Sequence, residues 1–374
     1  MSKVAILCNM PSSVSSARSE LIAAIRAAGH QAYWGCIYDG KIHESYSEQT
    51  AVCLPIVASR NNTNPLGELR SMNSVRKAVK KNGIEYVIVY GVKNHAAMAL
   101  GARQGGARRV LCVVNGSGNL FRVGGWKGRL LRAIAFPMLR LAYKRSCAIC
   151  FQNEDDRQLF LQKKLVKDTD RCFVTGGSGV NLEIFRKQVL PEENRFLFLS
   201  RITPTKGVVE YIQAAEIVRR KYPDAVFDIV GPLDAAVESA VGRHLQDIIE
   251  QAVADGIVRY HGATDDVPSW MGKCRFFVYP SYYPEGVPRC AIQAIASGRP
   301  IITCQTPGCK ETVRDGENGF AVLPRDVAAL AEKMLWMIEN PEKAREMANA
   351  SRALAEERFD VNKINQALLD RVGG

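Results

Sequence analysis

The stretch FFVYPSYYPEGVPRCAIQAIASGRPIITCQTPGCKETV, residues 276–313, decides the fold of the chain. Its first four residues, 276–279, are apolar or aromatic and predict a buried strand that ends at a proline. A loop follows over 281–288, and the apolar spacing over 289–298 predicts a helix that ends at a glycine. A second strand is expected over 300–303. The order strand, loop, helix and strand is typical of a parallel α/β sheet.

The same alternation opens the chain. Residues 3–9 predict a buried strand, 18–28 a helix and 31–37 a second strand, which together make a Rossmann-like half-unit. The most glycine-dense segment, 176–181, is interpreted as the crossing between two domains. The alternation then starts again with a strand over 195–200.

We therefore expect an α/β chain with two Rossmann-like domains. The predicted boundaries are 1–185 for the first domain, 186–359 for the second and 360–374 for a C-terminal helix. A break at Asp360 leaves that helix free to pack on the first domain. Open sheets of this kind bind ligands at the carboxyl ends of their strands, so the loops there hold the candidate site residues.

Charge is distributed unevenly along the 374 residues, whose net charge is +12. Residues 1–190 hold 28 Lys and Arg against 12 Asp and Glu, whereas the remainder holds 22 against 26. The basic half predicts an anionic partner. The 11 cysteines follow no disulfide spacing, which favours a reducing compartment. Cys147 and Cys150 form a C-x-x-C pair, but no second pair follows, so we expect buried thiols and no metal site.

No signal peptide or spanning segment is recognisable. The chain opens on a predicted strand, and it contains no run of about 18 apolar residues. We therefore expect a protein that is either cytoplasmic or peripheral to the membrane.

The segment FRVGGWKGRLLRAIAFPMLRLAYKRS, residues 121–146, contains seven basic residues and no acid. Such a basic amphipathic helix with a tryptophan fits an element that lies on an anionic lipid surface. The alternative is a core helix with a solvated basic face. Nucleic acid is not predicted as a partner, because no recognised binding motif accompanies the charge. The predicted membrane-binding residues are Arg122, Trp126, Lys127, Arg129, Arg132 and Arg140.

Polar residues also follow predicted strands of the first domain. His95 opens a helix, and Asn115 and Ser117 lie in a glycine-containing loop. These three are candidates for contacts to a substrate, although a histidine at a helix start is often a cap or a surface residue. Ser13 lies in a serine-rich loop before a helix, where it could bind an anion or belong to a solvated turn. The glycine fingerprint of a dinucleotide site is absent there.

Two loops of the second domain carry the groups that a diphosphate needs. Arg201 and Lys206 lie between a predicted strand and a helix, so two cations stand beside free helical N–H groups. Glu285 lies in the second loop, which also precedes a helix. Two such loops in one Rossmann-like domain predict a nucleotide-diphosphate site.

These segments resemble those of retaining glycosyltransferases of family 4, which have the GT-B fold of two Rossmann-like domains facing across a cleft. The resemblance is carried by GSGVNLEIF (177–185), FLSRITPTKG (198–207), VFDIVGP (226–232), YHGATDDV (260–267), YPSYYPEGVPRCAIQAIASGRPIIT (279–303) and PGCKETVRDGENGF (307–320). In the first half, SRNNTNPLGELRSMNSVRKAVKK (59–81) and FQNEDD (151–156) also fit. Within the family, the chain looks similar to enzymes that extend lipid-linked sugars for bacterial surface polysaccharides or glycoproteins.

The resemblance implies catalytic roles for three residues. Arg201 and Lys206 would bind the donor's diphosphate and neutralise the leaving group. Glu285 would contact the hydroxyls of the transferred sugar. The resemblance implies that the first domain faces the acceptor, which makes His95, Asn115 and Ser117 the acceptor-side candidates. The family's histidine on this domain has no clear match, and Asn115 or Ser117 occupies its place.

The resemblance also implies the donor site. The family carries a second glutamate for the ribose, but this chain has Gln293 there, which loses the charge and should weaken the contact by about 1 kcal/mol. The donor-binding candidates are Gly286, Val287, Pro288, Gln293, Ser13 and Gly231.

The implied reaction is the transfer of an N-acetylhexosamine or a hexose from a UDP-sugar, with retention of anomeric configuration. No metal or cofactor is implied, because cations and helix ends neutralise the diphosphate. The implied acceptor is a polyprenyl-diphosphate-linked sugar at the membrane, which would account for the basic first half. The alternatives are a GT-B enzyme with a soluble acceptor or epimerase activity, and a non-catalytic nucleotide-binding protein.

Overall fold

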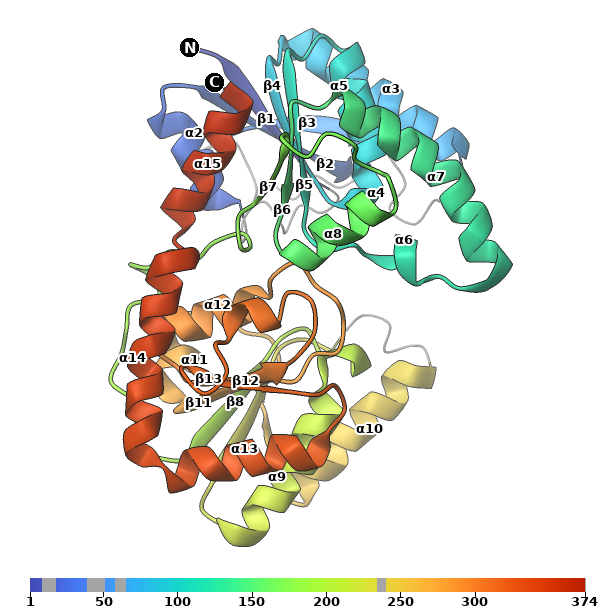
Figure 1. Ribbon diagram of the computed structural model, residues 1–374. Coiled ribbons are helices and arrows are strands. Elements are labelled where there is room, and N and C mark those ends of the chain that lie inside the picture. The colour runs from blue at the N-terminus through green and yellow to red at the C-terminus, as the bar shows by residue number, and fades with distance from the viewer. Residues whose placement is uncertain (9–17, 39–50, 58–64, 234–239, 374) are drawn as a thin grey trace. The chain divides into compact units, whose positions relative to one another are not determined.

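The chain forms two compact units (Figure 1). Unit 1 comprises Met1–Gly179 together with Val361–Gly374, and unit 2 comprises Val180–Asp360. The structure is a computed structural model, and it describes residues 1–8, 18–38, 51–57, 65–233 and 240–373.

Unit 1 is built on a seven-stranded parallel sheet of order β3-β2-β1-β4-β5-β6-β7. Ile6 on β1 lies opposite Trp34 on β2 and Ile88 on β4. The central strands are buried on both faces, as parallel sheets usually are. The strands are β1 (Lys3–Cys8), β2 (Gln31–Tyr38), β3 (Val52–Val57), β4 (Tyr86–Tyr90), β5 (Arg109–Val114), β6 (Ala148–Phe151) and β7 (Cys172–Val174).

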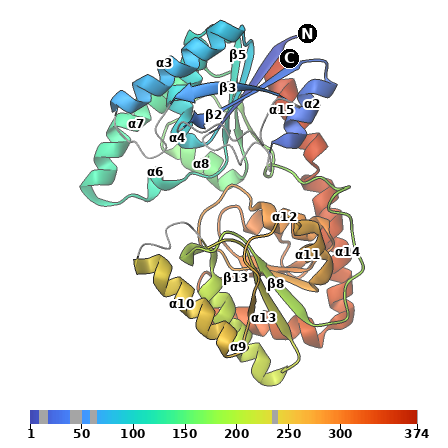
Figure 2. The ribbon, with the colours of Figure 1, turned by 180° about the vertical axis from the view of Figure 1, so that it is seen from behind.

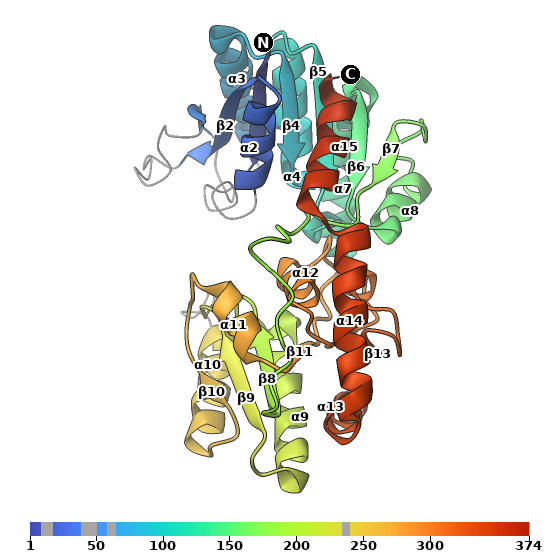
Figure 3. The same ribbon diagram turned by 90° about the vertical axis from the view of Figure 1, so that its left-hand side faces the viewer.

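Helices cover both faces of this sheet. One face packs against α2 (Ser19–Ala27) and α15 (Val361–Gly373), which lie side by side in Figure 3. Ile6 and Leu368 join the core on this face, whereas Leu7 points to the opposite core because side chains alternate along a strand. The predicted packing of the C-terminal helix on the first domain is thereby confirmed.

The opposite face of the sheet carries most of the remaining helices of unit 1. They are α3 (Pro65–Asn82), α4 (Val92–Asn94), the π-helix η2 (His95–Ala99), α5 (Leu100–Gln104), α6 (Asn119–Arg122), α7 (Gly125–Arg145) and α8 (Glu154–Gln162).

Unit 2 has a six-stranded parallel sheet of order β10-β9-β8-β11-β12-β13. Phe196 stacks on Phe227 with ring centroids 5.2 Å apart and also packs on Phe276, so aromatic rings link the three central strands. The strands are β8 (Arg195–Leu199), β9 (Val226–Val230), β10 (Arg259–Tyr260), β11 (Phe276–Tyr279), β12 (Ile301–Cys304) and β13 (Gly319–Val322).

The helices of unit 2 lie on both faces of its sheet, with α9 beside α10 (Figure 2). They are η3 (Pro204–Lys206), α9 (Val208–Lys221), α10 (Ala240–Ala254), α11 (Val267–Lys273), α12 (Arg289–Ala296), η5 (Lys310–Thr312), α13 (Val327–Glu339) and α14 (Pro341–Arg358).

The α/β class with two Rossmann-like domains is confirmed, but the division falls at Gly179 and Val180. The sequence places it after residue 185. Residues 180–185 group with unit 2 because the Val180 N–H donates to the Phe359 carbonyl at 2.8 Å and Phe185 packs in the core of that unit.

Other elements also differ from expectation. The sequence does not predict the edge strands β3 and β13; β3 contains Pro55, which an edge strand tolerates. After β12 and its turn, the chain forms only the single turn η5. The helix that His95 is expected to open begins there as the π-helix η2.

Candidate functional site

Two loops of unit 2 meet at the carboxyl edge of its sheet. The loop after β8 carries Arg201 and Lys206, and the loop after β11 carries Glu285. Gly207 has a φ of 82°, and a Cβ there would lie 2.2 Å from the Pro280 carbonyl oxygen. Glycine therefore allows the first loop to pack directly against the second.

Lys206 and Glu285 form an ion pair between these loops. The distance from Lys206 Nζ to Glu285 Oε1 is 2.7 Å, and the two side chains are only 12% and 18% exposed. The hydroxyl of Tyr279 donates to the same oxygen at 2.7 Å, and that of Ser281 at 3.0 Å. Three donors thus converge on one carboxylate oxygen, which an ionised glutamate can accept.

Tyr279 is a buried donor with a fixed position. Burial, followed by the negative charge of Glu285, raises the pKa of Tyr279 well above its ordinary value of 10, so the hydroxyl keeps its proton. The Tyr279 carbonyl accepts a 2.8 Å hydrogen bond from Thr303 on β12. Lys206 Nζ lies 5.7 Å from the Tyr279 ring centroid and 5.5 Å from that of Tyr283.

The turn after β12 is hydrogen-bonded to the Glu285 loop. The Glu285 N–H donates to the Pro307 carbonyl at 3.2 Å, and the Thr306 hydroxyl donates to the Ser281 carbonyl at 3.0 Å. Gly308 has a φ of 84°, and a Cβ there would lie 2.1 Å from the Gly286 carbonyl oxygen. The position of Glu285 therefore depends on a turn about twenty residues further along the chain.

The other predicted donor residues lie along the same edge. Gly286, Val287 and Pro288 are buried and lead directly into α12, and Gln293 is half-buried on that helix. Gly231 follows β9, where a Cβ would lie 1.7 Å from the Ser200 carbonyl oxygen. This close approach places the end of β9 against the Arg201 loop.

Sequence reasoning missed Tyr279 and Ser281 as functional residues. Both lie in the stretch that opened the sequence analysis, on either side of Pro280. The pattern that could have indicated them is a hydroxyl-bearing residue on each side of the proline that ends the strand. The contact with Glu285 depends on the folding of the loop, which the residue types alone do not show.

His95 belongs to the core of unit 1. It is 0% exposed, with Nε2 3.1 Å from the Val113 carbonyl oxygen and Nδ1 2.9 Å from the Tyr143 hydroxyl oxygen. A carbonyl only accepts, so Nε2 carries the proton and Tyr143 donates to Nδ1. Burial lowers the pKa of His95 to about 4. A neutral, enclosed imidazole has no route to a substrate, so the structure corrects its assignment to the acceptor side.

The other two acceptor candidates lie in the loop after β5 but face different surroundings. Asn115 is exposed, whereas Ser117 is buried and hydrogen-bonded to Asp156. The Asp156 N–H donates to Asn153 Oδ1 at 2.8 Å, as in a capped helix start. Burial raises the pKa of Asp156 to about 6. Asn115 therefore remains the more accessible acceptor candidate.

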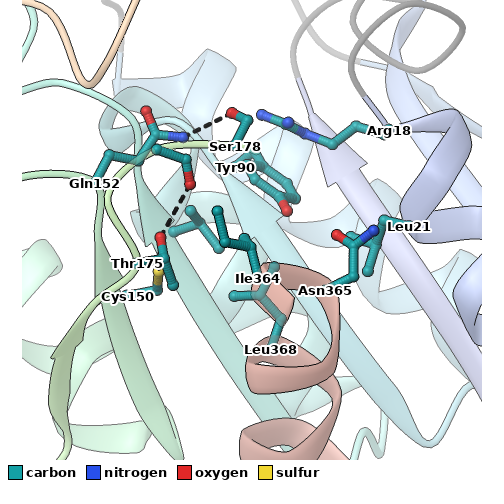
Figure 4. Close-up of a pocket in the computed structure, with 12 residues that line it drawn as sticks. Arg18, Leu21, Tyr90, Cys150, Gln152, Thr175, Ser178, Ile364, Asn365 and Leu368 are labelled. Carbon is teal, nitrogen blue, oxygen red and sulfur yellow. Dashed lines mark hydrogen bonds between the residues drawn. The ribbon is translucent and has the colours of Figure 1, made fainter. Parts of the chain in front are cut away.

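A small cavity in unit 1 lies between the sheet, α2 and α15 (Figure 4). Arg18 covers the Tyr90 ring, with Cζ 3.8 Å from its centroid, and Gln152 donates to the Ser178 hydroxyl at 2.8 Å. The space open to the centre of a water molecule is about 10 Å³, enough for about one water. The cavity is too small for a sugar, and we assign it no substrate.

Helix α7 exposes an apolar stripe on the side away from the core. Trp126, Leu130, Ile134 and Leu141 are 70%, 55%, 46% and 42% exposed, and their spacing of four, four and seven residues places them on one helix face. The buried residues of α7 lie on the other side and include Tyr143. Such an arrangement is unusual for a helix that only covers a core.

The basic residues of α7 fall into two groups. Lys127 and Arg129 are exposed beside the apolar stripe. Arg132 instead donates to the Val123 carbonyl at 2.9 Å, and Arg140 donates to the Lys164 carbonyl at 2.9 Å. The last two arginines therefore stabilise unit 1 itself, which weakens their assignment to a membrane surface.

Two further predicted residues cannot be placed. Ser13 and the side chain of Arg122 lie outside the described residues. Among the helices that the structure describes, none is long and apolar enough to cross a membrane.

Comparison with known proteins identifies the type of domain. Residues 180–354, nearly all of unit 2, match the family model of glycosyl transferases group 1. Over 333 residues, the chain is 26% identical to N,N'-diacetylbacillosaminyl-diphospho-undecaprenol alpha-1,3-N-acetylgalactosaminyltransferase of Campylobacter jejuni. That alignment covers 84% of each protein.

Solved structures confirm the GT-B fold. HepE of Anabaena, crystallised in complex with UDP, superposes with a TM-score of 0.80 at 18% identity and covers 98% of each chain. Sucrose-phosphate synthase of Thermosynechococcus elongatus superposes with a TM-score of 0.79 at 18% identity, over 99% of this chain and 98% of that one. At these identities the likeness establishes the architecture alone.

Proposed function

We propose that the chain transfers a sugar from a UDP-sugar to a polyprenyl-diphosphate-linked sugar, starting from the match of residues 180–354 to the family model of glycosyl transferases group 1. The observation that carries the proposal is the contact between Lys206 and Glu285 at the carboxyl edge of a parallel sheet. Lys206 supplies a cation that can bind a diphosphate, and the neighbouring Glu285 supplies a carboxylate that can accept hydrogen bonds from sugar hydroxyls.

The proposed donor is a UDP-linked N-acetylhexosamine or hexose. Arg201 and Lys206 would bind its diphosphate, and the backbone of Gly286 and Val287 would approach the sugar and phosphate. Glu285 would accept hydrogen bonds from the sugar, and Gln293 would contact the ribose. The UDP complex of HepE supports a uridine nucleotide, since that protein shares the fold.

The proposed mechanism retains the anomeric configuration and needs no metal or cofactor. As the bond to the diphosphate breaks, negative charge develops on the leaving group. Arg201, which is exposed, and Lys206, which is largely enclosed, would stabilise this charge as cations placed beside it. Retention rests on the resemblance to family 4 and is tested by the configuration of the product.

The proposed acceptor is lipid-linked and anionic. The named activity of the Campylobacter relative concerns a sugar on undecaprenyl diphosphate, which supports this class of acceptor. The exposed stripe of α7, with Lys127 and Arg129 beside it, suits the surface of a bilayer that contains anionic lipid. We therefore propose that the protein works at the inner face of the cytoplasmic membrane.

The deciding experiment is a donor screen with the full chain. A panel of UDP-sugars is incubated with a short polyprenyl-diphosphate-linked sugar, and released UDP and the extended lipid are both measured. The proposal expects one donor to give both products in equal amounts. NMR of the product then reads the new anomeric configuration.

The screen also separates the alternatives. Extension of a free sugar or sugar phosphate, with none of the lipid-linked acceptor, would indicate a soluble-acceptor enzyme. Epimerised sugar without transfer would indicate an epimerase. Tight UDP binding without any product would indicate a non-catalytic nucleotide-binding protein.

A further inference from the structure

Glu285 is held by side chains from its own loop as well as by Lys206. Tyr279 and Ser281 lie six and four residues before it in the sequence, and both hydroxyls are within 3.0 Å of Oε1. Tyr279 is 1% exposed and Ser281 is 0% exposed. A buried hydroxyl costs free energy unless it is hydrogen-bonded. The hydrogen bonds from both hydroxyls to Glu285 Oε1 therefore stabilise this arrangement.

The two hydroxyls are held rigidly. The carbonyl of Tyr279 is bonded by Thr303, and the carbonyl of Ser281 is bonded by Thr306, so β12 and its turn fix both residues. The Ser281 hydroxyl also lies 3.4 Å from the Thr205 carbonyl oxygen, but its single proton favours the shorter contact of 3.0 Å to Glu285.

Lys206 has a different character from the two hydroxyls. Its ammonium ends a flexible four-carbon chain and can turn between partners. In the proposed function it also serves the diphosphate, whose charge exceeds that of one carboxylate. When the donor binds, the Lys206 ammonium would therefore move toward the phosphates, and its ion pair with Glu285 would weaken.

We propose that Tyr279 and Ser281 are positioning residues that keep the Glu285 carboxylate in place for the transferred sugar while Lys206 binds the donor's diphosphate. This inference rests on the proposed function. In this model the cations bind the diphosphate of the nucleotide, and the two hydroxyls orient Glu285 toward the transferred sugar. Loss of the hydroxyls should then impair catalysis and leave nucleotide binding intact.

Tyr279→Phe and Ser281→Ala test the inference, because each removes one hydroxyl with little change in shape. A hydrogen bond to a charged group is stronger than one between neutral groups, so we expect kcat to fall by about ten-fold in each variant and further in the double variant. The affinity for UDP should change by less than about two-fold, since UDP lacks the transferred sugar that Glu285 would contact.

Tyr211→Phe is the matched control. Tyr211 is also fully buried in unit 2, and its hydroxyl donates to the Phe196 carbonyl at 3.0 Å, away from Glu285. We expect it to lower thermal stability like Tyr279→Phe but to keep kcat. Equal losses of kcat in both variants, or unchanged kcat in the Tyr279 and Ser281 variants, would overturn the inference.

A measurement without turnover separates this inference from the proposed function. Crystals of the wild type and of the Tyr279→Phe/Ser281→Ala double variant are grown with UDP. We expect the Glu285 carboxylate to stay beside both hydroxyls in the wild type and to be displaced in the double variant. An unmoved carboxylate contradicts the positioning role, whereas failure of every donor in the screen contradicts only the proposed function.

Discussion

Lys206 Nζ and Glu285 Oε1 lie 2.7 Å apart, although the elements from α9 to β11 separate the two residues in the sequence. The pair brings together the loop after β8 and the loop after β11, which are neighbouring strands in the sheet. A parallel sheet places the carboxyl ends of adjacent strands side by side, so the two loops meet without any sequence proximity.

Lys206→Met should weaken UDP binding and transfer together. The change removes the cation that we assign to the diphosphate, and a charge-assisted contact of this type corresponds to about ten- to a hundred-fold in affinity. Isothermal titration with UDP and initial rates of transfer measure the two effects. Lys221→Met, which removes an exposed pair with Glu339, is the control and should leave both unchanged.

Gln293→Glu should tighten UDP binding. The substitution restores the carboxylate that the resemblance places at the ribose, and a charged acceptor gains about 1 kcal/mol over an amide, or about five-fold in affinity. Titration with UDP and with uracil tests it. A gain for both ligands would locate the effect away from the ribose, and no gain for UDP would show that the ribose is held elsewhere.

Lys127→Glu combined with Arg129→Glu should reduce binding to anionic vesicles. Each basic residue near such a surface contributes about 1 kcal/mol, so the double reversal should lower partitioning at least about ten-fold. Co-sedimentation with phosphatidylglycerol vesicles measures it, with phosphatidylcholine as the neutral comparison. Lys343→Glu on the exposed face of α14 is the control.

The apolar stripe of α7 gives an independent check on the same surface. Leu130→Ser and Ile134→Ser remove exposed side chains and should weaken vesicle binding without lowering the free energy of unfolding. Arg132 and Arg140 are unsuitable for this test, since both bind backbone carbonyls within unit 1. Undiminished binding by the leucine and isoleucine variants would exclude insertion of this stripe.

Gly308→Ala should reduce transfer by displacing the Glu285 loop. The new Cβ would lie 2.1 Å from the Gly286 carbonyl oxygen, so the backbone must move. An alanine at this positive φ also costs about 1–2 kcal/mol. Gly316→Ala is the matched control, because its φ is 78° and no atom lies within 4 Å of the added carbon. We expect similar strain in both variants but loss of transfer only in Gly308→Ala.

His95 should make unit 1 less stable in acid. Its pKa is about 4 in the folded chain and 6.5 in an exposed imidazole, so the unfolded chain binds more protons between these values. The stability that His95 contributes is present above pH 6.5 and is lost as pH falls toward 4, by about 3 kcal/mol in all. Denaturant unfolding from pH 7 to 4 measures the slope.

His95→Leu should flatten this slope relative to the wild type, although its stability at pH 7 is lower because Tyr143 loses an acceptor. The quantity to compare is the difference in free energy of unfolding between the two proteins at each pH. Asp156, with a pKa of about 6, contributes the opposite slope in the same range to both proteins. An unaltered slope in His95→Leu would contradict the buried, neutral state.

The residues themselves determine the local elements and the chemistry available in each loop. The apolar run of β11, the glycines after helices and the repeated strand, loop and helix order were sufficient to predict two parallel α/β domains. They were insufficient for the edge strands β3 and β13; β3 contains Pro55, which a central strand excludes. Arg201, Lys206 and Glu285 were found because both of their loops lie between a predicted strand and a helix, and because these segments resemble those of family 4 glycosyltransferases.

Tertiary structure alone decided which of these residues touch. It placed Tyr279 and Ser281 on Glu285, enclosed His95 against Tyr143, and turned the apolar stripe of α7 away from the core. The local pattern of a helix shows that it has two faces, but which face is buried depends on segments distant in the chain. The physical reason is that burial and hydrogen-bond partners arise from contacts between elements, whereas helical and strand periodicity arises within each one.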